Sequence, residues 1–295
     1  MVAADDAAVD EARAFVAAAE AQTASLPSPH TFPVDVQRAA MAAGAEPAVP
    51  HAAVDTIAGR PVRVLSPEGD VDGTFLHLHG GGWTMGSNAF QDQRLWRYAC
   101  EAQVRVISVD YRLAPEHPFP ACIDDCVAVA AEVADGRTVI GGESAGAHLS
   151  ALVLLRLGGA GFCGANLAYG CYDLGMSASQ RAWGDRNVVL STPIIRWHLD
   201  QLLPGLDDDA RRDPAISPLF ADLEAAALPP ALLTVGTDDP MLDDSVQLAA
   251  RWPGARLDVY EGGFHAFDLF PLRLGELATR RQIDFVKQCV SPTSA

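Results

Sequence analysis

A serine held between two glycines, Gly142-x-Ser144-x-Gly146, constrains this chain more than any other feature. The apolar run Thr138–Ile140 before it predicts a short buried strand, and Ala147–Leu157 after it predicts a helix. A serine in so tight a strand-to-helix turn takes a strained backbone and presents its hydroxyl at the carboxyl end of a sheet. The free N–H groups and the positive dipole end of the following helix would stabilise an anion there. The pattern therefore indicates a nucleophile, although a Gly/Ser turn by itself is equally a structural feature.

Short apolar runs and helical runs alternate along most of the chain. Strands are predicted at Arg60–Leu65, Thr74–Leu78, Val104–Val109, Arg137–Ile140, Ala165–Tyr169, Leu232–Val235 and Arg256–Val259. Helices are predicted at Asp92–Glu101, Ile123–Ala134, Ala147–Leu157, Ser245–Arg251 and Glu276–Gln288. This alternation is typical of a mostly parallel sheet with helices on both faces. The Asp72-Gly73 pair favours a tight turn, so we expect the first two strands to form an antiparallel hairpin at one edge.

Two regions interrupt the alternation. Helices predicted at Asp10–Gln22 and Val34–Ala43 precede the first strand, and residues 173–228 contain a further helix around Pro193–Leu203. We expect these regions to pack together as a helical cap formed by residues 1–50 and 175–225. The core would then consist of residues 51–174 and 226–295, in a single composite domain.

The charge of the chain restricts its partners. Its net charge of −17 and pI near 4.7 argue against binding to nucleic acid or to an anionic membrane. The first twenty residues are Ala-rich and acidic, unlike a signal peptide, and no apolar run reaches the length of a membrane span. None of the six cysteines forms a C-x-x-C motif. We therefore expect free thiols in a cytoplasmic protein, with a Cys163–Cys171 bridge as the alternative.

A second glycine-rich segment, His79-Gly80-Gly81-Gly82-Trp83, follows the strand that ends near Leu78. Successive glycines let the backbone approach a ligand closely and direct its amides inward. Such a loop is known to form an oxyanion hole together with the N–H of the residue after the serine. The amides of Gly81, Gly82 and Ala145 are therefore the candidates, although three glycines alone also occur in flexible loops.

A general base and the acid that orients it are expected after the serine, in the order serine, acid, histidine. Asp238 and Asp239 follow the predicted strand 232–235, and His265 follows the last predicted strand. His265 would accept the Ser144 proton, and Asp239 or Asp238 would hold its ring and stabilise the imidazolium. Alone, a late histidine is most often a surface residue and paired aspartates often cap a helix.

A third motif, Tyr111-Arg-Leu-Ala-Pro-Glu-His-Pro-Phe-Pro-Ala121, is the most specific stretch in the chain. Together with His79-Gly-Gly-Gly82 and Gly142-Glu-Ser-Ala-Gly146, it resembles the bacterial hormone-sensitive lipase family of esterases, an α/β-hydrolase group, from about His77 to the C-terminus. In that family an Asp precedes Pro-Leu, with a second Asp three residues after the Pro. Asp239-Pro-Met-Leu-Asp243 matches this pattern, so the resemblance selects Asp239 over Asp238. Glu143 replaces the commoner Asp, and Ala147 replaces a third glycine.

The resemblance implies an α/β-hydrolase fold and hydrolysis of short-acyl esters of small molecules, without a cofactor or metal. Two alternatives remain: an amidase or deacetylase with the same triad, and a ligand-binding protein that has lost catalysis. Trp83, Glu143 and Trp197 are candidates for the substrate pocket. His77 and His79 have the spacing of a metal pair on a strand edge, but no third ligand is suitably spaced. A homodimer is compatible with the sequence.

Overall fold

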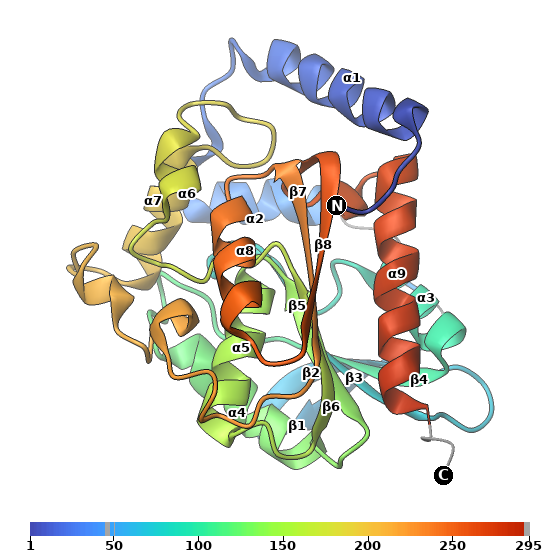
Figure 1. The fold of residues 1–295 in the computed structure, drawn as a ribbon. Helices are drawn as coiled ribbons and strands as arrows, with labels where there is room; N and C mark the ends of the chain where they lie inside the picture. Colours follow the sequence, from blue (N-terminus) through green and yellow to red (C-terminus); the bar gives the residue numbers. More distant parts are fainter. Residues whose placement is uncertain (45–47, 50, 292–295) are drawn as a thin grey trace.

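An eight-stranded sheet is the central element of the computed structural model, which describes residues 1–44, 48–49 and 51–291 (Figure 1). The strand order is β1-β2-β4-β3-β5-β6-β7-β8. β2 pairs antiparallel with β1 and β4, and the remaining neighbours are parallel, so the prediction of a mostly parallel sheet is confirmed. The strands are β1 (Ala52–Ile57), β2 (Arg60–Leu65), β3 (Gly73–Leu78), β4 (Val104–Val109), β5 (Thr138–Glu143), β6 (Phe162–Ala168), β7 (Ala231–Asp238) and β8 (Ala255–Phe264).

Helices cover both faces of this sheet. α4 (Ala121–Val133), α5 (Ala145–Leu157) and α8 (Leu242–Arg251) lie on one face, and α3 (Asp92–Ala102) and α9 (Arg273–Val290) lie on the other (Figure 1). The other helical elements are α1 (Asp6–Thr23), η1 (Pro29–Thr31), α2 (Val34–Ala43), α6 (Ala178–Ala182), α7 (Thr192–Leu202), η2 (Ala210–Arg212), η3 (Pro218–Phe220) and η4 (Phe267–Leu269).

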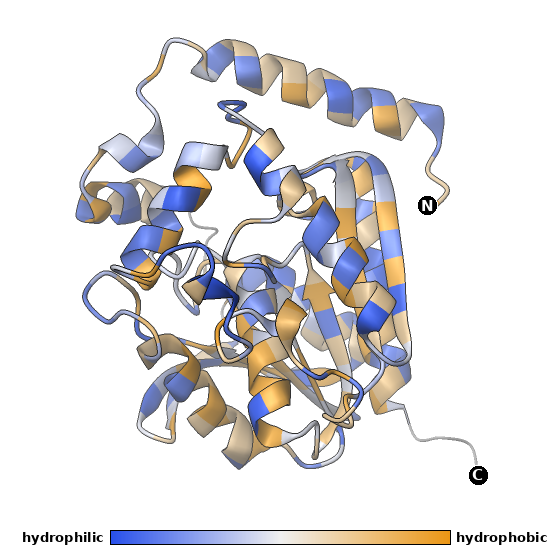
Figure 2. Ribbon diagram, turned by 60° about the vertical axis from the view of Figure 1, so that its left-hand side comes forward, coloured by the Kyte–Doolittle hydropathy of each residue, from blue (hydrophilic) through white to orange (hydrophobic). Residues whose placement is uncertain are grey.

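Alternating side chains of the central strands supply two apolar layers, one on each face. Leu76 and Leu78 of β3 join Ile140 in the layer under α4 and α5, whereas Phe75 faces α3 and stacks on Tyr98 with ring centroids 5.0 Å apart. Apolar residues concentrate accordingly in the sheet and in the helix faces turned toward it, while α1 alternates apolar and polar residues (Figure 2). Burial on both faces makes the central strands a rigid base for the loops at their carboxyl ends.

The three helices predicted outside the alternating pattern are present as α1, α2 and α7, although α1 begins at Asp6, four residues before the predicted start. The short α6 was not predicted. α1 packs on β8 through a small cluster in which Ala12 and Val16 meet Tyr260 and Phe264. α7 begins at a capping residue, Ser191, and lies against η1. η1 and α7 are therefore neighbours in space although they lie far apart in the sequence. No helix in the described part of the chain is long and apolar enough to cross a membrane.

The predicted hairpin between residues 60–65 and 74–78 is wrong. Asp72 donates its N–H to the carbonyl of Gln103 at 2.8 Å and leads β3 into the parallel part of the sheet, between β4 and β5. The hairpin instead joins β1 and β2 through Ala58 and Gly59, with φ values of 48° and 74° that match a two-residue type I′ turn. β1 escaped prediction because this edge strand is exposed along most of its length and carries no apolar alternation.

The six cysteines are free thiols, as predicted, and Cys163 and Cys171 are not bridged.

Candidate active site

Ser144 occupies a strained turn between β5 and α5. Its backbone has φ 54° and ψ −117°, a conformation that L-residues rarely adopt. The glycines on either side are sterically required: a Cβ at Gly142 would lie 1.9 Å from the Leu78 carbonyl oxygen, and one at Gly146 would lie 1.8 Å from the same atom. The turn is thus pressed against the end of β3, and this lifts the Ser144 hydroxyl above the sheet.

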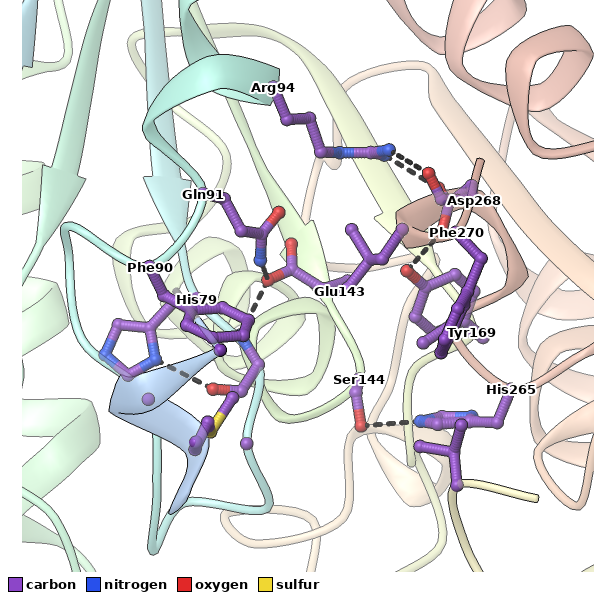
Figure 3. A pocket seen from close by; sticks show the side chains of 18 of the residues that line it. His79, Phe90, Gln91, Arg94, Glu143, Ser144, Tyr169, His265, Asp268 and Phe270 are labelled. Atoms are coloured by element: carbon purple, nitrogen blue, oxygen red, sulfur yellow. Dashed lines mark hydrogen bonds and ion pairs between the residues drawn. The ribbon is translucent and has the colours of Figure 1, made fainter. Parts of the chain in front are cut away.

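His265 and Asp239 meet Ser144 from two other strand ends. The His265 Nε2 lies 3.0 Å from the Ser144 Oγ, across a separation of 121 residues (Figure 3). The His265 Nδ1 lies 3.0 and 3.1 Å from the two carboxylate oxygens of Asp239. Asp239 is buried and also accepts the Met241 N–H at 2.8 Å, whereas Asp238 is partly exposed at the end of β7. With Nδ1–H donating to the carboxylate, Nε2 is free to accept the serine proton.

The glycine loop after β3 is oriented peptide by peptide. The His79 Nδ1–H donates to the Gly80 carbonyl at 2.8 Å, and burial lowers the pKa of His79. The Gly81 carbonyl accepts from the N–H groups of Thr84 at 3.2 Å and Met85 at 2.9 Å. Because each trans peptide is planar, a carbonyl fixed on one side directs the next N–H to the opposite side. The amides of Gly81 and Gly82 are therefore oriented away from these donors, and both glycines line the cavity that contains Ser144.

Glu143 supports this loop from beneath. Its buried carboxylate accepts the Gly80 N–H at 2.8 Å and the His77 Nε2–H at 3.0 Å, and it also contacts the Gln91 amide. Burial alone would raise the pKa of Glu143, but attraction to His77 and the hydrogen bonds outweigh it and lower the pKa to about 2. The residue before the nucleophile is thus an ionised group that holds the start of the glycine loop.

A cavity of about 1160 Å³ opens above Ser144 and His265. Glu143 belongs to its lining, but among the described lining residues neither Trp83 nor Trp197 occurs, which corrects the pocket prediction for both. Trp83 turns into the core, where its Nε1–H donates to the His148 Nδ1 at 3.1 Å. Trp197 lies beside His198 on α7, and the helix presents His198 to the cavity instead.

The geometry does not support a metal site at His77 and His79. The described residues contain no group of three or more His, Cys, Asp or Glu side chains placed to hold an ion. The two rings have other partners: His77 bonds Glu143 and Ser108, and His79 stacks on Tyr111 with centroids 4.2 Å apart. Both histidines serve the packing beneath the glycine loop.

Three residues that the sequence did not single out lie beside His265: Tyr169 and Asp268 are buried, and the Arg94 side chain is 12% exposed. Arg94 of α3 donates to the Asp268 carboxylate at 2.7 Å, and Asp268 lies three residues after His265. The Tyr169 hydroxyl donates to the other Asp268 oxygen at 2.5 Å, and its ring packs edge-on against His265 with centroids 5.0 Å apart (Figure 3). No periodicity distinguishes an arginine that turns inward from one on a helix surface, so only the fold reveals this cluster.

Comparisons with known proteins agree with this geometry. A model of the α/β-hydrolase fold family matches residues 75–269. The carboxylic ester hydrolase LipN of Mycobacterium tuberculosis is 36% identical over 249 residues, which cover 76% of this chain and 65% of LipN. Carboxylesterase NlhH of the same species is 34% identical over 221 residues, covering 70% of this chain and 69% of NlhH. Just under two thirds of LipN is thus represented in this chain.

Solved structures are similar over nearly the whole chain. A hormone-sensitive lipase from a metagenome library superposes with a TM-score of 0.85 at 27% identity, covering 95% of this chain and 98% of its own. The crystal structure of EstE5 soaked by p-nitrophenyl butyrate gives a TM-score of 0.81 at 28% identity, covering 98% and 100% of the two chains.

Proposed function

We propose that this chain, which belongs to the α/β-hydrolase fold family, is a serine carboxylesterase that hydrolyses short-acyl esters of small molecules through an acyl-enzyme. The observation that carries the proposal is the continuous hydrogen-bonded path from Asp239 through His265 to the strained Ser144, beneath the cavity. The carboxylesterase names of LipN and NlhH support the reaction class, and the soak of EstE5 with a butyrate ester supports a short acyl group.

The proposed reaction has two halves. The Ser144 Oγ attacks the ester carbonyl carbon while the His265 Nε2 takes its proton, and the carbonyl oxygen becomes an oxyanion. Collapse of this intermediate breaks the bond to the leaving alcohol, which receives the proton from His265. Water, deprotonated by His265, then attacks the acyl-enzyme, and the second collapse releases the acid and restores Ser144. Asp239 orients the imidazole and stabilises its charged form in both halves.

The proposed oxyanion hole consists of the N–H groups of Gly81, Gly82 and Ala145. The two loop amides are supported by the carbonyl orientations described above, and the Ala145 amide is the first of α5, directly after the serine. Donors of this kind contribute roughly 3 kcal/mol each to transition-state stabilisation. Their placement at a helix start adds the favourable end of the α5 dipole.

We propose that residues 1–50 and 175–225 form a cap over a core of residues 51–174 and 226–295. Pro29, Gln37 and Met41 from the first cap region line the cavity, and so do Ile194 and His198 from the second. Residues 45–47 and 50 of the first region lie outside the described residues. The two cap regions thus supply the cavity walls that would select the substrate.

Two further proposals concern location and assembly. We place the protein in the cytoplasm because its six cysteines, free in the structure, suit a reducing compartment. The homodimer stays a prediction, which light scattering of the purified protein tests.

Substitution of the nucleophile tests the proposed function. Ser144→Ala should lower kcat for p-nitrophenyl acetate by about 10⁴-fold or more, because no acyl-enzyme can form without the hydroxyl. A fluorophosphonate should add to Ser144 of the unsubstituted protein, as located by peptide mass spectrometry. Parallel assays of an ester and the matching anilide separate an esterase from an amidase. Near-native turnover by Ser144→Ala would overturn the proposal.

A further inference from the structure

Thr84, two residues after Gly82, is a buried junction between the glycine loop and two distant helices. Its hydroxyl oxygen lies 2.8 Å from the His198 Nδ1 of α7. Its carbonyl oxygen accepts the Arg38 Nε–H of α2 at 2.8 Å. Arg38 is itself fixed by Glu116, with N–O distances of 2.8 and 2.9 Å. Thr84 thus contacts both the His198 imidazole of α7 and the Arg38 guanidinium of α2.

The same residue fixes the peptide between Gly81 and Gly82. The Thr84 N–H donates to the Gly81 carbonyl at 3.2 Å, and the Thr84 hydroxyl lies 3.5 Å from that oxygen. This peptide is trans and planar, so the direction of the Gly81 carbonyl sets the direction of the Gly82 N–H. Together with Met85, whose N–H donates to the same carbonyl at 2.9 Å, Thr84 therefore helps to set where one of the proposed oxyanion donors lies.

His198 also packs on Gly82. A Cβ added at Gly82 would lie 2.4 to 2.6 Å from the ring atoms of His198, so the ring packs directly on the glycine. Burial lowers the pKa of His198 to about 4, so the ring is neutral at physiological pH. It can then exchange a neutral hydrogen bond with the Thr84 hydroxyl and close one side of the cavity.

We propose that Thr84 is a positioning residue through which α2 and α7 hold the Gly82 amide in its catalytic orientation. This inference rests on the proposed esterase function and extends it: the oxyanion hole is complete only while both helices are docked on the glycine loop. Loss of the Thr84 hydroxyl would leave substrate binding intact but misplace a donor that acts on the transition state. Such a change lowers kcat and leaves KM nearly unaltered.

A matched pair of variants tests this role. Thr84→Val keeps the shape of the side chain but removes the hydroxyl, and we expect kcat for p-nitrophenyl acetate to fall about 10- to 100-fold with KM within about twofold. Thr84→Ser restores the hydroxyl and should return kcat to within about threefold of the original value. Thr138→Val is the control, because it removes another buried hydroxyl, bonded to the Val133 carbonyl at 2.9 Å, far from the cavity; its kcat should match the unsubstituted protein.

A transition-state analogue gives a second readout that packing alone would not move. An alkyl trifluoromethyl ketone adds to the serine and forms a tetrahedral alkoxide, so its affinity reports on the oxyanion donors. We expect Thr84→Val to weaken inhibition by the same factor by which kcat falls. Equal kcat and equal inhibition in Thr84→Val and the unsubstituted protein would overturn the inference, and so would equal losses in Thr84→Val and Thr84→Ser.

A double substitution tests the partner. If the hydroxyl acts through His198, adding Thr84→Val to His198→Phe should lower kcat by less than about twofold further, because the hydrogen bond is already gone. A further loss as large as that of Thr84→Val alone would exclude this coupling. Ser144→Ala run alongside separates the two proposals: if it is inactive while Thr84→Val is unaffected, the esterase assignment stands and only the role of Thr84 fails.

Discussion

The guanidinium of Arg94 binds both the side chain and the main chain of Asp268, at 2.7 Å to the carboxylate and 2.8 Å to the carbonyl oxygen. Arg94 belongs to α3 and Asp268 to η4, and 174 residues separate them. The Asp268 side chain is fully buried and that of Arg94 is 12% exposed. Because Asp268 lies three residues after His265, this pair anchors the loop that presents the imidazole to Ser144. The geometry of the proposed triad thus depends on an ion pair outside it.

Removing one partner of this pair should destabilise the fold strongly. Arg94→Met leaves the buried Asp268 carboxylate without its cation, and we expect the free energy of unfolding to fall by about 3–5 kcal/mol. Arg186→Met is the matched control: Arg186 and Glu20 pair at 2.8 Å with side chains 42% and 38% exposed, and exposed pairs contribute about 1 kcal/mol or less. Urea denaturation measures both variants. Equal losses in the two would show that burial of the first pair is irrelevant to its contribution.

The two neighbouring aspartates at the end of β7 should differ sharply. Asp239→Asn keeps the shape of the side chain but removes the carboxylate that accepts the His265 Nδ1–H, so the imidazole adopts the wrong tautomer. We expect kcat to fall by about 10⁴-fold. Asp238→Asn should retain kcat, because its side chain is partly exposed and the His265 bond is made by Asp239. Ester hydrolysis at saturating substrate distinguishes them. A larger loss in Asp238→Asn than in Asp239→Asn would show that Asp238, and not Asp239, orients His265.

The turn around Ser144 should not tolerate a methyl group. Gly146→Ala would place a Cβ 1.8 Å from the Leu78 carbonyl oxygen, so either β3 or α5 must move. We expect a loss of about 3 kcal/mol or more in the free energy of unfolding, or no folded protein. Gly44→Ala, where the nearest atom lies at an ordinary 3.5 Å, should change stability by no more than about 1 kcal/mol. Thermal unfolding compares the pair, and a stable Gly146→Ala protein would contradict the steric argument.

His148 should make the protein acid-sensitive. Burial lowers the pKa of His148 from 6.5 to about 4, so between these values the unfolded chain binds a proton that the folded chain does not. Above pH 6.5 His148 therefore leaves the free energy of unfolding independent of pH. As the pH falls from 6.5 toward 4, His148 lowers the free energy of unfolding by about 3 kcal/mol in total.

His148→Gln tests that dependence. Glutamine does not titrate, and it can still accept from the Trp83 Nε1–H. The variant should lose less stability than the unsubstituted protein between pH 7 and pH 4, as measured by urea denaturation across that range. The burial of Asp244, which raises the pKa of its carboxyl to about 6, acts in the opposite direction but is common to both proteins. Identical pH profiles would mean that His148 does not titrate on unfolding.

Local sequence patterns were sufficient for most of the fold. The apolar runs predicted seven of the strands because each buries apolar side chains against the helices, fully in the central strands and partly in β2 and β8. The spacing of Gly142, Ser144 and Gly146 predicted the turn that the Leu78 carbonyl imposes. The order serine, acid, histidine is that of the α/β-hydrolase pattern, and the resemblance to the esterase family selected Asp239 over Asp238. Topology explains why the three can meet, because parallel strands deliver their following loops to the same edge. In each case, residues near in sequence, a family pattern or a rule of topology carried the information.

The tertiary structure decided what depends on contacts between distant segments. It paired β2 with β1 and β4 instead of β3, turned Trp83 into the core, and brought Arg94 to Asp268 and Arg38 with His198 to Thr84. These partners lie far apart along the chain and follow no periodicity. Their hydrogen bonds form only where the packed sheet and helices have already brought the groups within reach. The sequence by itself therefore determined the fold class and the candidates for the chemistry, whereas packing alone determined which side chains hold those candidates in place.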